Sequence, residues 1–377
     1  MFGRGVRLFR LLGFEVRLDW SWLIIAALVI WSLAGAVFPS YVEGLSLGTY
    51  WWMAVVGAAG LFLSIVLHEL GHSLVARGFG IPMTGITLFV FGGVAEMGGE
   101  PPSPAAEFFM AIAGPLTSVF LAGVAWGIRH LNDAVAGPIE VTAIFFYLSW
   151  MNVVLAAFNI IPAFPLDGGR VLRSILWALS KNLLRSTRIA AAVGTGFALL
   201  LMAWGIVSLF FGNFFLAVWW IVIGLFIRGA SRMSYRQVLL QDALAGQPVS
   251  RFLDLHPVTV SPATTVRELV DNYVYRSQAK SFPIVSDGHL IGCVTVDQVR
   301  QVPRARWDQI TLGNLAAGCA RGRIIPPETD AASAVTTMTR LNTNRLMVVD
   351  HDRFLGTVSL TEIMNFLGRK LEFEQAG

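Results

Sequence analysis

Charged residues and cysteines are both scarce in this sequence. Asp, Glu, Lys and Arg make up 14% of its 377 residues and hydrophobic residues 55%, whereas an average soluble domain has about 25% and about 45–50%. So little charge excludes a disordered chain, a coiled coil and a purely soluble enzyme. Two cysteines are too few for a disulfide scaffold or a cysteine-rich zinc site. The chain is therefore expected to lie largely in a lipid bilayer.

The charges that are present divide the chain into two parts. Residues 1–236 hold 14 Lys and Arg and 10 Asp and Glu, whereas residues 237–377 hold 14 of each kind. The whole net charge of +4 therefore belongs to the apolar first part. This distribution argues against a nucleic-acid-binding tail and predicts a membrane domain followed by a soluble one.

Six segments are long and apolar enough to cross a bilayer, which takes about 20 residues. Six spans place both termini on one side of the membrane. Thirteen of the 14 basic residues of the first part fall on that side, and Arg129 alone falls on the other. The positive-inside rule then predicts a multi-pass cell-membrane protein whose termini and tail are cytoplasmic. The predicted spans are 20–38, 49–77, 105–129, 140–161, 189–211 and 214–230.

Two segments of the first part lie outside these spans. Residues 1–19 are basic and amphipathic, which predicts a membrane-surface helix rather than a cleaved signal. Residues 81–99 are rich in β-formers and carry glycine pairs at 92–93 and 98–99. They predict a hairpin or re-entrant sheet at membrane depth, with a plain cytoplasmic loop as the alternative.

Two histidines and a glutamate interrupt the second predicted span, in the run His68-Glu69-Leu70-Gly71-His72. Residues i and i+4 share a helix face, so both imidazoles can bind one cation while Glu69 lies beside them to activate a water. A charged side chain in a span costs at least about 2.5–3.5 kcal/mol, so the cluster needs a compensating partner. The alternative is a hydrogen-bonded cluster that only holds helices together.

A third metal ligand is expected from elsewhere, because zinc in hydrolases usually takes three protein ligands and leaves one position open. The best candidate is Asp167, in the run NIIPAFPLDGGR at 159–170. The prolines of this run end the fourth span, and its glycine pair turns the chain. Asp167 and His72 both lie close to basic residues at cytoplasmic helix ends, at depths on the order of 5–10 Å. The alternative role for Asp167 is to cap the next helix.

These motifs resemble those of the site-2 proteases, which are intramembrane zinc metalloproteases. The resemblance covers residues from about 50 to 180 closely. It rests on the His68–His72 motif within a span, on Ala113-Gly114-Pro115 at the start of the third span, and on the run 159–170.

The resemblance implies a function for five residues of these motifs. His68, His72 and Asp167 would hold one zinc ion, Glu69 would be the general base, and Asn159 would help to hold the substrate chain or its oxyanion. The implied activity is cleavage of transmembrane segments of single-span membrane proteins near the cytoplasmic face. The β-rich segment could then pair with the unwound substrate as an added strand.

The tail contains an internal repeat. Residues 280–298 align with 344–362 at a constant offset of 64, and each unit predicts strand, helix, strand, turn, strand, helix. The repeat resembles a pair of cystathionine-β-synthase-type (CBS) motifs, which often bind adenine nucleotides such as ATP, ADP or AMP. In that family a Gly-x-x-Thr/Ser-x-x-Asp pattern contacts the ribose. The first copy has Gln298 in place of that Asp, and the second has Glu362. A dimerisation or docking module, which would make a homodimer, is the alternative. The candidate nucleotide residues are Thr295, Asp297, Ser359 and Glu362.

The predicted fold is thus an α-helical polytopic membrane protein with a β-rich re-entrant segment, followed by a soluble α/β tandem CBS module. Its predicted parts are an amphipathic segment (1–19), a membrane protease domain (20–236) and two CBS motifs (246–303 and 307–370). The competing functions are a CBS-gated transporter or channel and an inactive membrane scaffold. A transporter would usually show an internal hydropathy repeat, and residues 1–236 have none.

Overall fold

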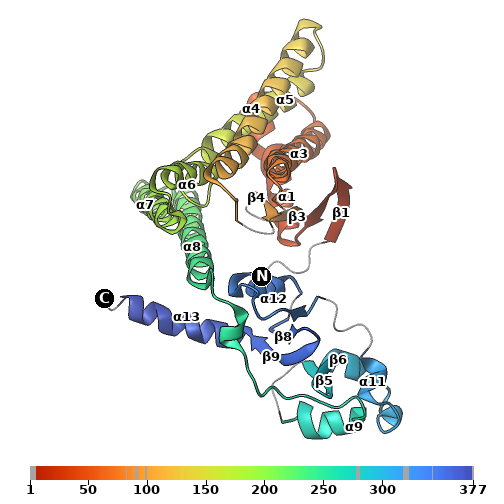
Figure 1. The fold of residues 1–377 in the computed structure, drawn as a ribbon. Coiled ribbons are helices and arrows are strands. Elements are labelled where there is room, and N and C mark those ends of the chain that lie inside the picture. The colour runs from red at the N-terminus through yellow and green to blue at the C-terminus, as the bar shows by residue number, and fades with distance from the viewer. Residues whose placement is uncertain are drawn as a thin grey trace. The chain divides into compact units, whose positions relative to one another are not determined.

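The computed structural model describes residues 6–375, except 82, 90–91, 98–99, 277–280, 317–321 and 342. The chain divides into two compact units, Met1–Arg236 and Gln237–Gly377 (Figure 1). Each unit is described by itself.

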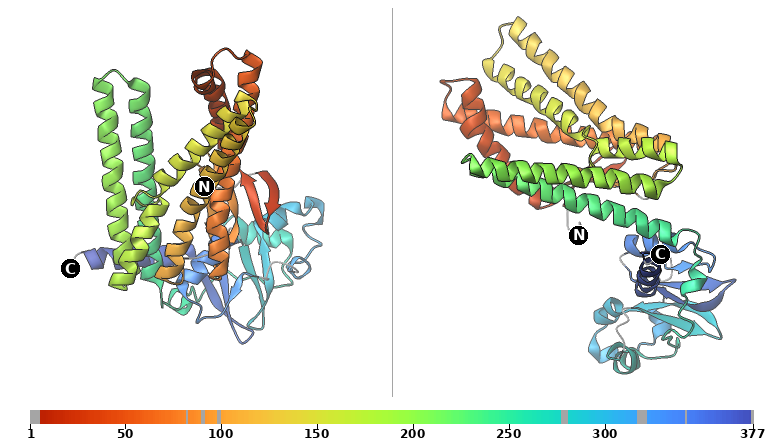
Figure 2. Two further views of the ribbon diagram at one scale, coloured as in Figure 1. Left: turned by 90° about the horizontal axis from the view of Figure 1, so that it is seen from above. Right: turned by 90° about the vertical axis from the view of Figure 1, so that its left-hand side faces the viewer.

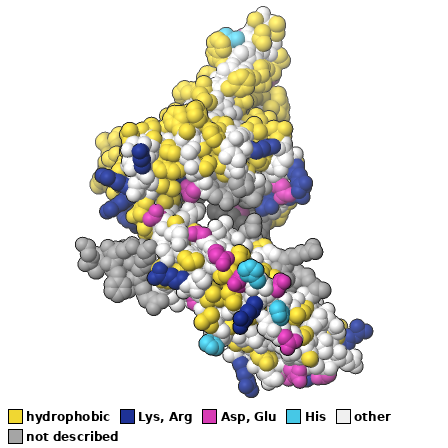
Figure 3. All heavy atoms as spheres, viewed as in Figure 1, with side chains coloured by type: hydrophobic (Ala, Val, Ile, Leu, Met, Phe, Trp, Pro, Cys, Tyr) yellow, Lys and Arg dark blue, Asp and Glu magenta, His cyan; other side chains and the backbone are white. Residues whose placement is uncertain are grey.

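The first unit is a bundle of helices. Within the described residues, six helices are long and apolar enough to cross a membrane, as predicted. On the face shown in Figure 3, hydrophobic side chains cover most of these helices, and Lys and Arg gather toward one end. The spans are Ser21–Tyr41 (α1, Ser21–Ser32; a π-helical turn, Leu33–Val37; α2, Phe38–Tyr41), Leu47–Gly78 (α3), Pro104–Ala134 (α4), Ile139–Asn159 (α5), Leu183–Phe210 (α7) and Phe214–Leu244 (α8).

Small residues let these helices approach closely, as is usual where packing rather than hydrophobicity drives association in lipid. A Cβ on Gly71 of α3 would lie 2.4 Å from Oγ1 of Thr117 on α4. In both views of Figure 2, α7 and α8 run side by side, and a Cβ on Gly205 of α7 would lie 2.9 Å from the carbonyl of Ala217 on α8. The short α6 (Asp167–Ser180) links α5 to α7 and is not one of the spans.

The N-terminal segment is a β-hairpin, so the expected membrane-surface helix is wrong for residues 6–18. Strands β1 (Val6–Leu11) and β2 (Phe14–Leu18) pair antiparallel. Leu12 and Gly13 both have positive φ, 49° and 92°, which is typical of a two-residue hairpin turn. Hydrogen bonds from the arginines at 10 and 17 lower the pKa of Glu15 to about 2.

This hairpin extends the sheet expected from residues 81–99. Strands β3 (Met83–Phe89) and β4 (Gly92–Met97) form the predicted hairpin, and β2 pairs parallel with β3, so that the order is β1-β2-β3-β4. Its buried residues Val16, Ile86 and Leu88 pack against α3 around Val66 and Leu70. The sheet therefore lies beside the part of α3 that carries the histidine motif.

The second unit is a five-stranded sheet, with the order β5-β6-β9-β8-β7, and its helices. The sheet repeats at the predicted offset of 64 residues: β5 (Ser281–Ser286) matches β8 (Arg345–Asp350), and β6 (His289–Thr295) matches β9 (Arg353–Ser359). Each copy has a separate hydrophobic core. The other elements are 3-10 turns at Val249–Phe252 and Arg304–Arg306, a π-helical turn at Val270–Val274, α9 (Val266–Leu269), α10 (Val296–Gln301), α11 (Leu312–Leu315), β7 (Ile324–Ile325), α12 (Ala331–Arg340) and α13 (Leu360–Gln375).

Candidate metal centre

The two motif histidines lie one turn apart on α3, and their side chains are only 4% and 8% exposed. Nδ1 of His72 donates to the Met110 carbonyl at 2.6 Å, and Nδ1 of His68 lies 2.8 Å from Oγ of Ser118. A hydrogen bond at Nδ1 fixes the ring and leaves Nε2 as the coordinating nitrogen, as in most metal-bound histidines. Both Nε2 atoms therefore face the same point.

Asp167 completes the cluster from α6. Its Oδ2 lies 3.2 Å from Nε2 of His68 and 3.2 Å from Nε2 of His72. It is the first residue of α6, whose N-cap is Leu166 without a side-chain capping bond, so Asp167 does not cap this helix. Burial tends to raise the pKa of the Asp167 carboxyl, but the two imidazoles hold it well below its usual range. The carboxyl is therefore ionised, which is the form that binds a metal.

The spacing of these three atoms fits zinc. In a tetrahedral site with metal–ligand distances of about 2.0–2.1 Å, two ligand atoms are about 3.3–3.4 Å apart. The two imidazole–carboxylate distances are both 3.2 Å, and the two Nε2 atoms are 3.3 Å apart. The three donors can therefore occupy three corners of one tetrahedron.

Gly114 of α4 leaves space beside these donors. A Cβ at this position would lie 2.2 Å from Nε2 of His72 and 2.6 Å from Nε2 of His68. Those separations are close to a zinc–nitrogen bond length of about 2.0–2.1 Å. Only a glycine at this position keeps that space free of protein atoms, so the cradle as well as the donor set suits a metal ion.

Glu69 lies next to the cluster, against strand β4. A Cβ on Gly93 of this strand would lie 2.6 Å from Cγ and 3.2 Å from Oε1 of Glu69. The strand can approach the carboxylate this closely because residue 93 has no side chain. Glu69 thus lies between the candidate metal ligands on its own helix and an edge strand of the sheet.

Asn159 is the last residue of α5 and lies at the start of the loop that leads to Asp167. Its Nδ2 donates to the Leu155 carbonyl one turn earlier at 3.0 Å. Asn159 is half-buried, and the structure records no bond from it to the three candidate ligands. Its proposed contact with substrate remains a prediction.

Helix α4 supplies residues whose roles at the site the sequence analysis did not identify. Their spacings of three, four and four residues place them on one face of the helix. This face touches both imidazoles and, farther along, an arginine of α6. An acidic residue inside a predicted span was the available signal, because such groups are rarely without a role. The residues are Glu107, Met110, Gly114 and Ser118.

The tail residues chosen for nucleotide binding are engaged in helix capping. Thr295 forms a reciprocal capping box with Gln298 at the start of α10. Ser359 and Glu362 form the matching pair at α13, with backbone-to-side-chain distances of 3.0 and 3.2 Å. Asp297 is 85% exposed and lies 3.5 Å from Arg300. Three of these four residues therefore have a capping role, and nucleotide binding by the tail remains a prediction.

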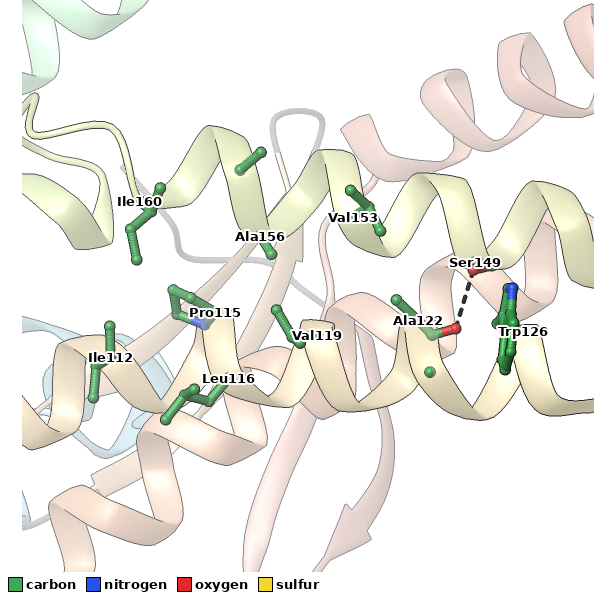
Figure 4. A pocket seen from close by; sticks show the side chains of 12 residues that line it. Ile112, Pro115, Leu116, Val119, Ala122, Trp126, Ser149, Val153, Ala156 and Ile160 are labelled. Carbon is green, nitrogen blue, oxygen red and sulfur yellow. Dashed lines mark hydrogen bonds between the residues drawn. The ribbon is translucent and has the colours of Figure 1, made fainter.

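An apolar groove of about 560 Å³ lies between α4 and α5, away from the candidate metal ligands (Figure 4). It runs from Ile112 and Ile160 at one end to Trp126 at the other. Oγ of Ser149 donates to the Ala122 carbonyl across it at 3.0 Å. None of the candidate metal ligands lines this groove, so its position gives no support to a catalytic role.

Comparison with known proteins identifies both parts of the chain. The model of peptidase family M50 matches residues 56–132 and 127–203, and the CBS domain model matches residues 249–304 and 323–369. Rip3 of Mycobacterium tuberculosis, named as a zinc metalloprotease, is 31% identical over 96% of this chain and 93% of its own. The chain therefore belongs to peptidase family M50 and is a site-2 protease-like zinc metalloprotease with a pair of CBS motifs.

Two further matches come from Methanocaldococcus jannaschii. Zinc metalloprotease MJ0392 is 29% identical over 96% of this chain and 95% of its own. A solved site-2 protease from this organism is 31% identical, covers 61% of this chain and 94% of its own, and superposes with a TM-score of 0.42. The family assignment and the six helices favour a multi-pass membrane peptidase over the transporter, channel and scaffold alternatives.

Proposed function

We propose that this metalloprotease is an intramembrane endopeptidase, which cleaves transmembrane segments of single-span membrane proteins near the cytoplasmic face. The observation that carries the proposal is the approach of Nε2 of His68, Nε2 of His72 and Oδ2 of Asp167 to within 3.3 Å of one another. Two of these donors lie on α3, one of the six apolar helices. A metal centre on such a helix suits a substrate that arrives from the bilayer.

In this proposal His68, His72 and Asp167 hold one zinc ion. When bound, zinc polarises a substrate carbonyl and makes a water molecule acidic enough to attack at neutral pH. The Glu69 carboxylate takes the proton from the attacking water and delivers it to the departing amide nitrogen. Asn159 positions the substrate chain through its side-chain amide.

The edge of strand β4 offers a place for the substrate backbone. A helical substrate must unwind before its carbonyls can react, and unwound backbone in lipid needs hydrogen-bond partners. Within the described residues β4 is an edge strand of the four-stranded sheet, and its Gly93 lies against Glu69. Strand addition at β4 would therefore bring an extended segment to the catalytic carboxylate.

Proline substitutions on β4 test this pairing. Phe89 lies on β3, between β2 and β4, so a proline there would break the sheet itself. Neighbouring residues of a strand direct their N–H groups to opposite edges. Of the variants Val94→Pro and Ala95→Pro, one therefore removes an N–H that binds β3 and the other removes an N–H at the free edge. We expect the sheet to tolerate the second. The folded variant should lose cleavage but keep its zinc. Wild-type cleavage by that variant would contradict strand addition.

The orientation and the tail complete the proposal. The distribution of basic residues in 1–236 supports a cytoplasmic location for both termini and the CBS tail by the positive-inside rule. There the tail regulates the protease, either by binding an adenine nucleotide or by pairing with a second copy. The capping roles of Ser359 and Glu362 favour the second of these modes.

A matched pair of variants tests the catalytic proposal. Purified wild type, Glu69→Gln and Glu140→Gln are analysed for zinc and for cleavage of a single-span membrane protein in liposomes. Glu140 is an acidic residue in the first turn of α5 and serves as the control. We expect all three proteins to bind zinc, and Glu69→Gln alone to lose about 100- to 10,000-fold in rate. Equal cleavage by Glu69→Gln and wild type would refute the mechanism.

A further inference from the structure

A buried ion pair joins α4 to α6 near the candidate metal centre. Nε of Arg173 donates to Oε1 of Glu107 at 2.6 Å, and Nη2 of Arg173 also contacts this oxygen. Nη2 donates in addition to Oε2 of Glu100 at 3.1 Å. The side chains of Arg173 and Glu107 are 3% and 0% exposed. The pair is therefore shielded from water almost completely, although Glu107 belongs to an apolar helix.

Such a pair is expensive to bury and is weak evidence of stabilisation by itself. Removing two charges from water costs several kcal/mol per ion, and a well-packed apolar pair is often at least as stable. Oε2 of Glu107 moreover has no hydrogen-bond partner among the described residues. Folding stability alone is therefore a weak explanation for the pair, and its position in the fold suggests a further role.

Arg173 contacts the loop that precedes Asp167 in the chain. Its guanidinium lies 5.2 Å from the centre of the Phe164 ring, three residues before Asp167. Arg173 also belongs to the helix that begins at Asp167. One side chain thus links both the loop before Asp167 and the helix after it to α4.

Helix α4 also holds the two imidazoles in place. His72 donates to the Met110 carbonyl and His68 contacts Ser118, and both partners lie on the same face of α4 as Glu107. The α3 ligands and the α6 ligand are therefore each fixed to this one face. Their mutual distances depend on how firmly α6 is held to it.

We propose that the ion pair of Glu107 and Arg173 is a positioning device, which holds Asp167 at the distance from the imidazoles at which all three can share one metal ion. The inference rests on the proposed metal centre. It differs from a purely structural role because it ties the pair to metal affinity and geometry rather than to folding stability.

The test uses the full chain, purified in detergent, with Zn²⁺ and Co²⁺ as probes. The main variant is Glu107→Gln with Arg173→Gln, which removes both charges of the pair. It also removes the contact of Arg173 with Glu100 and that of Glu107 with Arg170 at 3.9 Å. Arg173→Lys keeps the charge but loses the planar fork that reaches Glu107 and Glu100 together. Arg129→Gln is the control, because Arg129 pairs within α4 with Asp133 at 3.7 Å and does not link α4 to α6.

Three quantities are measured for each protein: the zinc dissociation constant by competition with a chelator, the visible spectrum of bound Co²⁺, and the melting temperature without metal. The Co²⁺ spectrum reports the number and geometry of ligands. We expect the double variant to bind zinc about 10- to 100-fold more weakly, the range seen for groups that orient metal ligands, with an altered Co²⁺ spectrum. Arg173→Lys should lie between the double variant and wild type, and Arg129→Gln should match wild type.

Wild-type zinc affinity and an unchanged Co²⁺ spectrum in the double variant would overturn the inference, even if its melting temperature fell. If the double variant does not fold, Arg173→Lys decides by the same two readouts. Failure of the proposed metal centre is distinguishable, because wild type itself would then bind no zinc.

Discussion

Replacing Gly114 by alanine is the most direct perturbation of the metal centre. The added Cβ would lie 2.2 Å from Nε2 of His72 and 2.6 Å from Nε2 of His68. An ordinary contact of about 3.4 Å requires the nearer imidazole to move by about 1 Å, whereas metal–ligand distances tolerate only about 0.2 Å. We therefore expect zinc to bind at least about 100-fold more weakly in Gly114→Ala, which corresponds to about 2.7 kcal/mol.

The assay compares zinc content and the zinc dissociation constant of purified wild type, Gly114→Ala and Gly123→Ala. Gly123 belongs to the same helix, and a Cβ there would meet no atom within 4 Å. Alanine at an open helical position adds about 0.5–1 kcal/mol of stability relative to glycine, so this control should bind zinc normally. If Gly114→Ala held one zinc ion per chain with wild-type affinity, the three donors would not form the metal site.

Three further outcomes are expected. Ser118→Ala removes the partner of Nδ1 of His68 and should weaken zinc binding about 10- to 100-fold, so an unchanged dissociation constant would show that Ser118 does not orient this ligand. The Cβ of Gly93→Ala would lie 2.6 Å from Cγ of Glu69, so this variant should cleave more slowly with an unchanged zinc content. A loss of zinc would instead show that Gly93 belongs to the metal site. Calorimetric titration of the full chain with ATP, ADP and AMP should give no heat at millimolar ligand, because Ser359 and Glu362 cap α13, and a saturable signal would restore the nucleotide sensor.

The spans and the tail repeat were predictable because their signals are local or strictly periodic. Each span is a long run of apolar residues whose cost in water is large, and its ends are marked by turns. The fourth span was expected to end at 161 and α5 ends at Asn159. The last span was expected to end at 230, but α8 continues to Leu244. A prediction from apolar length stops where polar residues become frequent, although the helix itself continues.

The N-terminal hairpin was missed because its pairing is not local. The alternation of basic and apolar residues in Val6–Leu11 suits either an amphipathic helix end or a strand. The structure decides for a strand, and β2 pairs in parallel with β3, with Glu15 opposite Gly85. This parallel pairing joins segments about 70 residues apart. The sequence around residue 15 therefore does not indicate which strand it pairs with.

The candidate metal centre likewise combines residues that are close in the sequence with residues that are distant in it. The spacing of His68 and His72 and the loop that ends at Asp167 predict which residues can meet. The structure adds that the common reference is α4, through Ser118 and the Met110 carbonyl for one helix and Glu107 for the other. A main-chain carbonyl leaves no mark in a sequence, and a buried glutamate is informative only once its arginine is known. Because α3 and α6 both contact this one face of α4, a substitution on it should weaken metal binding more than it lowers folding stability. The ratio of the change in metal affinity to the change in stability then measures how much each residue contributes to the site and how much to the fold.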